Sequence, residues 1–385
     1  MSTPVLHLGQ SVTNVGAEMA SICSTFNWDP VPSLAIDSSL SDTDTSMRCQ
    51  CSSIFSLPAP GSAFIESVVE KIFSTIESCD SLSTMVVTID GFGGIGSSLS
   101  NALLSELSDI LPSIQLKSVF LTPKYDTIQG LSPLNAIMCA QSVLYYSDNV
   151  MVRSLDDAMH LCISTPEVYG DAPSLSNCNN IIATDVMCAH FTGNNTTPSK
   201  IFDVRGSLWK LYALHKKGNK KGGTVFKASN AHKKLERYNS LRSACVNMRS
   251  LDLGSPYSQD SLITGQQASV GNYWEYSRNQ EATIYPSIEE VKNGIKHAIP
   301  SMKVRWHLTG SIASGKRNDE GSATVDKISA FAFKSMYGQV FLKNVIDTAK
   351  KLVRHGLYVH KYIEESNVGD EDLKDAIENL NEMVT

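Results

Sequence analysis

Four glycines stand within a run of six residues that follows a short apolar segment of the chain. The apolar segment, Thr84–Asp90, is rich in β-branched residues, which predicts a strand buried on both faces. The run Gly91–Gly96 lets the backbone turn sharply and approach a bound group, because glycine has no side chain. Leucines at helical spacing then predict an amphipathic helix over Leu99–Leu107. Since the first amides of a helix lack partners within it, this arrangement favours an anion, most often a phosphate.

The spacing of Gly91, Gly93 and Gly96 also fits the dinucleotide pattern G-x-G-x-x-G, which would make the chain an NAD-dependent oxidoreductase. Such a site also needs an acidic residue at the end of the following strand. The strand predicted over Ile114–Leu121 is instead followed by Thr122–Lys124, which holds no acid. The dinucleotide interpretation therefore ranks as a remote alternative, and an ordinary tight turn stays open beside the phosphate site.

A second strand–loop–helix unit opens the chain. Val5–Leu8 predicts a short strand, and Gly9–Gly16 leads from it into a helix that extends to Thr25. The loop of this unit could supply a second backbone cradle for the same ligand; an ordinary β–α turn is the alternative. We predict that the two loops lie side by side and form one shared nest of backbone amides.

Length and composition bound the class of protein. A chain of 385 residues is long enough for two or three domains, and its net charge of −6 argues against a nucleic-acid partner. The nine cysteines stand at irregular spacing, which fits reduced thiols in the cytoplasm. Apolar runs fall short of the ~18 residues that a membrane span needs, so no membrane partner is expected. The pair Cys49 and Cys51 lacks the neighbours of a zinc site, and no catalytic triad is evident.

Strands alternate with helices over roughly the first 165 residues, which predicts a mostly parallel sheet covered by helices on both faces. A long loop is expected over 38–61, a turn-rich segment over 193–223 and an irregular one over 250–286. The last two helices are expected to form an antiparallel hairpin joined by a turn at Gly356–Tyr362. Helices are predicted over Ser62–Cys79, Pro133–Tyr146, Asp156–Ile163, Ser176–Phe191, Ser287–Ala298, Gly338–Arg354 and Gly369–Met383.

A cluster of lysines, Lys216–Lys221, stands out in this acidic chain. A solvated loop is the ordinary interpretation of such a cluster. The alternative is a docking surface for an acidic protein partner.

Three separated stretches resemble the tubulin superfamily. Gly9–Gly16, which reads G-Q-S-V-T-N-V-G, is similar to the first nucleotide loop of tubulins. Phe92–Ser98 stands where tubulins carry the phosphate-binding signature G-G-G-T-G-S-G. Tyr358–Tyr362 and the acidic residues after it resemble the tubulin C-terminal hairpin. Within the superfamily delta-tubulin is most similar, through the segments Glu66–Ser81 and Asp156–Cys162 as well as this hairpin.

The resemblance implies a fold and a setting. The implied fold is α/β and tubulin-like, with a Rossmann-like GTP-binding domain over 1–173, a core helix over 174–192, a divergent α+β intermediate domain over 193–335 and a helical hairpin over 336–385. The implied role is a structural or assembly role in the cytoskeleton. The implied partners are tubulin-family proteins and microtubule or centriole components. The implied location is the cytoplasm, at centrioles, basal bodies or the axoneme of cilia and flagella.

The resemblance also implies a site for GTP or GDP. The residues so placed are Gly9, Gln10 and Ser11 beside the phosphates; Gly93, Gly94, Ile95, Gly96 and Ser97 around them; Asn135 near the ribose; and Asp156 and Asn179 at the guanine.

Several of these positions depart from the tubulin pattern. Ile95 replaces a threonine, Ser132 an acid and Asp156 an asparagine, while Ser39 stands where an acid lies near Mg²⁺. Each lost polar contact weakens binding by about 1–3 kcal/mol, and each ~1.4 kcal/mol is a tenfold change in affinity. We therefore expect nucleotide binding to be weakened and Mg²⁺ not to be held. A GTP-binding tubulin that polymerises in the microtubule lattice is the alternative.

Hydrolysis of GTP is not expected to be effective. In polymerising tubulins the catalytic acid comes from the loop after the core helix of the next subunit. Ser207, within the segment Phe202–Ser207, aligns with that acid. A serine cannot act as the general base that activates water.

Overall fold

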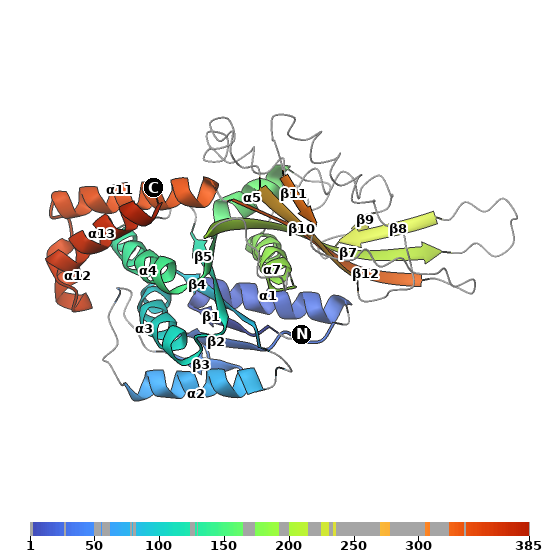
Figure 1. Ribbon diagram of the computed structural model, residues 1–385, viewed down its shortest axis with the longest axis horizontal. Helices are drawn as coiled ribbons and strands as arrows, with labels where there is room; N and C mark the ends of the chain where they lie inside the picture. Colours follow the sequence, from blue (N-terminus) through green and yellow to red (C-terminus); the bar gives the residue numbers. More distant parts are fainter. Residues whose placement is uncertain are drawn as a thin grey trace, which may run out of the picture.

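The computed structural model describes the following residues: 3–26, 28–49, 55, 62–77, 79, 82–123, 128, 130–164, 174–191, 200–214, 225–230, 234–235, 270–277, 305–308, 323–334 and 336–384. Among these, strands alternate with helices as far as α7, and the chain closes with three helices (Figure 1). The predicted helix over Ser287–Ala298 and the lysine cluster Lys216–Lys221 lie outside the described residues.

A parallel sheet forms the centre of the molecule. Its order is β3-β2-β1-β4-β5-β6-β7, and each neighbouring pair in this run is parallel. The strands are β1 (Val5–Leu8), β2 (Ser33–Asp37), β3 (Ser46–Arg48), β4 (Thr84–Asp90), β5 (Gln115–Thr122), β6 (Asn149–Ser154) and β7 (Ile201–Leu214). This arrangement is consistent with a Rossmann-like fold and confirms the predicted α/β class.

The sheet continues beyond β7 into antiparallel strands. β12 (Ala323–Lys334) pairs with β7 along its whole length, and β10 (Val270–Ser277) lies between β12 and β11 (Arg305–Leu308). On its other edge, β7 pairs with β8 (Val225–Asn230), and β8 pairs in turn with β9 (Lys234–Leu235). The predictions of a turn-rich 193–223 and an irregular 250–286 are therefore wrong at β7 and β10. Their common partner, β12, stands 110–132 residues after its paired residues in β7 and 50–62 residues after those in β10, beyond the reach of a local pattern.

Helices cover both faces of the sheet. They are α1 (Gln10–Phe26), α2 (Ala63–Glu77), α3 (Gly94–Ile110), α4 (Ser132–Tyr146), α5 (Leu155–Ser164), α7 (Leu175–Phe191), α11 (Met336–Arg354), α12 (Val359–Ser366) and α13 (Asp370–Val384). The helix predictions over Ser62–Cys79, Pro133–Tyr146, Asp156–Ile163, Ser176–Phe191, Gly338–Arg354 and Gly369–Met383 are confirmed to within two residues at their ends. Two other helices begin earlier than predicted: α3 begins at Gly94 rather than Leu99, and α1 begins at Gln10, inside the predicted loop Gly9–Gly16. No helix was predicted at α12, and the predicted loop over 38–61 contains β3.

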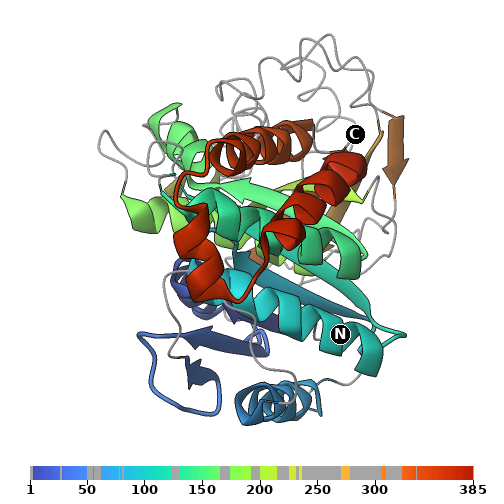
Figure 2. The same ribbon diagram turned by 90° about the vertical axis from the view of Figure 1, so that its left-hand side faces the viewer.

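Alternate residues along each strand feed two separate cores. Leu6, Val87 and Phe120 lie in the core beneath α2, α3 and α4, with α11 and α13 packed outside α4 (Figures 1 and 2). Val5 and Val86, one residue earlier in each strand, lie in the other core, beneath α1, α5 and α7. The parallel sheet is thus buried on both faces, as its continuous apolar strands predict.

The C-terminal segment departs from the predicted hairpin. A short helix, α12, begins within the turn that was expected between α11 and α13. Val359, Tyr362 and Ser366 are buried on one face of α12, at a helical spacing of three and four residues. Tyr358 and Asn367 adopt left-handed backbone angles at its two ends, with φ of 62° and 58°. Because most residues of the segment are polar, this narrow buried stripe was not recognised in the sequence.

Candidate functional site

The two predicted loops lie side by side at one edge of the sheet. β1 and β4 are adjacent parallel strands, with Leu8 opposite Ile89, so the loops that begin at Gly9 and Gly91 leave the sheet together. The chain proceeds from β1 to β2 in one direction and from β4 to β5 in the other. Such a reversal of strand order at the carboxyl ends of parallel strands is the usual place for a ligand in open α/β sheets. The two turns therefore lie side by side, as the sequence predicted, although residues 10–16 of the predicted first loop form the first turns of α1.

Glycines allow the two loops to touch. A methyl group on Gly96 would lie 2.2 Å from the carbonyl oxygen of Asp90 and 2.8 Å from that of Leu8. Gly9 has a φ of +105°, a left-handed conformation that favours glycine, and a methyl group there would lie 2.9 Å from Asp90 Cβ. The start of α3 is therefore pressed directly against the ends of β1 and β4.

The carboxylate of Asp90 lies at the centre of this contact. Ser11 Oγ donates a hydrogen bond of 2.8 Å to Asp90 Oδ2. The backbone N–H of Gly93 donates one of 3.3 Å to Asp90 Oδ1. Two donors assigned to a phosphate by the resemblance therefore bind a carboxylate of the chain itself.

The serines of the glycine run bind the helix backbone. Ser97 Oγ donates to the carbonyl oxygens of Gly93 and Gly94, at 2.7 and 3.2 Å, and Ser98 Oγ donates to that of Gly94 at 2.6 Å. Gly94 and Gly96 are buried, and Ile95 packs against the core beneath α3. The hydroxyl of Ser97 is thus engaged within its own helix.

Asn135, predicted near the ribose, supports the backbone of the glycine run through hydrogen bonds of its side-chain amide. It is buried in α4, and its Nδ2 donates to the carbonyl oxygen of Phe92 at 3.1 Å. Its Oδ1 accepts from the backbone N–H of Phe55 at 2.8 Å. Both ends of the amide therefore hold backbone in place, a structural role that the resemblance does not assign.

The remaining predicted residues lie on neighbouring elements. Gln10 is exposed at the start of α1. Asp156 stands at the start of α5, where its backbone N–H donates to Ser154 Oγ at 3.0 Å. Asn179 is half-buried in α7. Because β6 lies two strands from β4, Asp156 stands at a different part of the edge, whereas Asn179 belongs to α7, which packs against α1.

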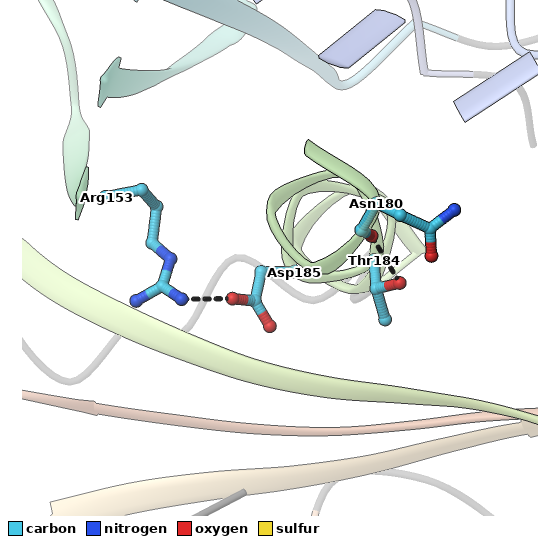
Figure 3. A network of polar contacts seen from close by, with 4 residues as sticks. All are labelled: Arg153, Asn180, Thr184 and Asp185. Atoms are coloured by element: carbon cyan, nitrogen blue, oxygen red, sulfur yellow. Dashed lines mark hydrogen bonds and ion pairs between the residues drawn. The ribbon is translucent and has the colours of Figure 1, made fainter. Parts of the chain in front are cut away.

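Polar contacts fix α7 against the sheet and against α1. Arg153 of β6 forms an ion pair of 2.5 Å with Asp185 of α7, and both side chains are almost fully buried (Figure 3). On another side of α7, Asn180 and Ser176 donate to the carboxylate of Glu18 in α1, at 2.9 and 2.6 Å. These contacts hold α7 in place beside the sheet.

The roles of Asp90 and Glu18 were not predicted from the sequence. A signal for Asp90 was present, because an acid that closes a strand immediately before a glycine run faces the amides of that run. The described residues hold no cluster of three or more His, Cys, Asp or Glu side chains that could bind a metal ion. None of their helices is both long and apolar enough to cross a membrane.

Comparison with known proteins finds a similarity to tubulins. The chain is 27% identical over 126 residues to the tubulin beta-2 chain of Emericella nidulans, a match over 32% of this chain and 27% of that protein. It is 27% identical over 140 residues to the tubulin beta chain of Cicer arietinum, over 34% of this chain and 30% of that protein. No family model matches the chain. The similarity to these beta-tubulins thus spans less than a third of their length, and it does not distinguish a type of tubulin.

The groups at the shared nest do not fit a bound triphosphate. A phosphate needs unpaired donors and a positive potential. Here Asp90 supplies a carboxylate and accepts from Ser11 and Gly93, while Ser97 is bonded within α3. Donors that the resemblance assigns to phosphate are thus engaged by groups of the protein itself.

Proposed function

We propose that this chain is a divergent, tubulin-like protein of the cytoskeleton, with a structural or assembly role and weakened binding of guanine nucleotide. The observation that carries the proposal is the meeting of the Gly9 and Gly93 loops at the point where the strand order reverses. The similarity to beta-tubulins of two organisms supports the same conclusion. Residues at the nest support the weakening, because Asp90 takes the place of an anion.

A finer proposal concerns the type of tubulin. The delta-like segments Asp156–Cys162 and Tyr358–Tyr362 favour a protein of centrioles, basal bodies or flagella, with tubulin-family proteins and microtubule or centriole components as its partners. GTP or GDP would be its ligand if one is bound at all. Effective hydrolysis is not part of the proposal, since Ser207 lies in the strand β7 rather than in a loop.

Association with tubulin tests the proposal directly. Purified protein is incubated with stabilised microtubules and sedimented, and separately mixed with soluble tubulin dimer and passed over a size-exclusion column. We expect saturable binding in at least one of these assays, and binding should persist after nucleotide is removed from the protein. A protein that stays in the supernatant and elutes alone would contradict the proposal.

The alternative is a GTP-binding tubulin that polymerises in the lattice. Protein purified without added nucleotide is denatured, and the released material is analysed by absorbance and chromatography. We expect no stoichiometric guanine nucleotide, and one equivalent of GTP or GDP would favour the alternative. Unchanged NADH fluorescence on addition of the protein is expected as well, and a change would revive the oxidoreductase interpretation.

A further inference from the structure

The nest at the ends of β1 and β4 has a resident anion of its own. The carboxylate of Asp90 accepts from Ser11 Oγ at 2.8 Å and from the Gly93 N–H at 3.3 Å. These two donors come from the two different loops, and their residues stand 79 and three positions away from Asp90. The carboxylate therefore engages two donors, one from each loop, that the resemblance assigns to an external phosphate.

The glycines beside Asp90 make room for its side chain. A methyl group on Gly9 would lie 2.9 Å from Asp90 Cβ, closer than real side chains approach, and one on Gly93 would lie 3.4 Å from Asp90 Cγ. Gly9 and Gly93 thus border the aspartate itself. The glycine pattern that suggests a cradle for phosphate is used here, at least in part, to accommodate a carboxylate.

We propose that Asp90 is the specificity-determining residue of this nest and that it excludes phosphate-bearing ligands by supplying the anion internally. The inference deepens the proposed function, on which it rests for the identity of the site. It names one side chain as the main cause of weakened nucleotide binding, ahead of the changes at Ile95, Ser132 and Asp156.

The expected size of the effect follows from electrostatics. A phosphate placed at the same donors would lie about 4 Å from the carboxylate, where like charges weaken binding by roughly fivefold in a water-like medium and a thousandfold in a partly buried one. Asp90 is partly buried, so removal of its charge is expected to tighten binding by at least about tenfold. The donors of Ser11 and Gly93 are released at the same time.

The experiment compares four full-length proteins: wild type, Asp90→Ser, Asp90→Asn and Asp109→Asn. Binding of a fluorescent GTP analogue is followed by anisotropy, with and without Mg²⁺, and inorganic tripolyphosphate is added as competitor. Asp90→Asn keeps the shape of the side chain, so it separates charge from space if Asp90→Ser fails to fold. Asp109→Asn is the control, because it removes the same charge from the exposed far end of α3.

We expect the wild type and Asp109→Asn to bind weakly and equally. Asp90→Ser and Asp90→Asn should bind at least about tenfold more tightly, and tripolyphosphate should displace the analogue from both. Folded Asp90 variants that gain no affinity would overturn the inference. So would a wild type that reaches their affinity once Mg²⁺ is added, since Asp90 would then act as a metal ligand. Neither result depends on association with microtubules, so failure of the proposed function is detected separately.

Discussion

At the scale of single residues, a glycine can make room either for a bound ligand or for another part of the protein. The run Gly91–Gly96 has the composition of a phosphate loop, yet the structure shows Gly96 in contact with two strand carbonyls. Gly9 and Gly93 border the side chain of Asp90. The absence of side chains is needed at all three positions for reasons internal to the fold. A glycine pattern therefore indicates that another group lies close to the backbone, but it does not distinguish a bound ligand from a part of the protein.

This distinction leads to a prediction about Gly96 and Gly93. A methyl group on Gly96 meets the backbone oxygens of Asp90 and Leu8 at 2.2 and 2.8 Å, so it can be accommodated only if α3 moves away from the ends of β4 and β1. Gly96→Ala is expected to lower the free energy of unfolding by about 3 kcal/mol. Gly93→Ala is the control, because its methyl group would be 3.4 Å from a side-chain atom, and we expect a loss below about 1 kcal/mol. Urea unfolding followed by circular dichroism measures both, and equal losses would contradict this account.

At the scale of elements, α7 is held by polar contacts as well as by packing. Arg153 links it to β6 through a buried ion pair, and Glu18 of α1 accepts from Asn180 and Ser176. Apolar residues of α7, among them Ile182 and Val186, lie in the core beneath the sheet. The sequence predicted a largely buried helix here, and the structure adds what orients it.

The ion pair provides the second prediction. Replacement of Asp185 by alanine removes this carboxylate from the buried Arg153, and the breaking of a buried pair typically lowers stability by about 3–5 kcal/mol. The double variant Arg153→Met with Asp185→Leu should regain most of this loss, because well-packed apolar side chains substitute for buried pairs. Lys374→Ala is the control: it breaks an exposed pair with Asp370 and is expected to change stability little. Thermal unfolding measures all three, and a double variant as unstable as Asp185→Ala would contradict the prediction.

The C-terminal helices show which helices can be predicted from local apolar patterns and which cannot. The buried stripes of α11 and α13 contain several large apolar residues, such as Ile346 and Leu380, and both helices were predicted. The stripe of α12 consists of only Val359, Tyr362 and Ser366 among polar residues, and that helix was missed. A helix of two turns with so small an apolar face is stabilised mainly by tertiary packing.

At the scale of the whole molecule, one sheet divides two apolar cores. On the side of the sheet covered by α1 and α7, burial keeps two histidines neutral. His7 of β1 lies on the face that packs against Gly16 of α1, and burial lowers its pKa to about 4. Burial, and then the charge of Lys117, lower the pKa of His190 in α7 to about 3. In the unfolded chain both histidines return to pKa values near 6.5.

The stability of the protein should therefore fall in mild acid. Between pH 6.5 and about 4 the unfolded chain binds protons that folded His7 does not, so its contribution is complete above pH 6.5 and decreases as the pH falls. The loss due to His7 alone is expected to approach about 3 kcal/mol at pH 4.

Urea unfolding measured from pH 7 to pH 4 checks this dependence. His7→Gln should flatten the slope of stability against pH, whatever its effect at pH 7, since the group that gains a proton is removed. His360→Gln, at an exposed position of α12, should leave the slope unchanged. A His7→Gln variant with the same slope as the wild type would show that another group is responsible.

The sequence by itself determined the alternation of strands and helices, the parallel sheet and the adjacency of the two glycine loops. These depend on local periodicity and on the order of the elements, which a single chain displays directly. Only the tertiary structure decided which groups meet at the nest, because Ser11 and Asp90 are bonded across 79 positions. It also decided that β7 and β10 are strands, since their hydrogen-bond partners lie far along the chain. Contacts between residues far apart in the sequence produce no periodic pattern in it. The nest is formed by such contacts, so its composition could not be predicted from the sequence.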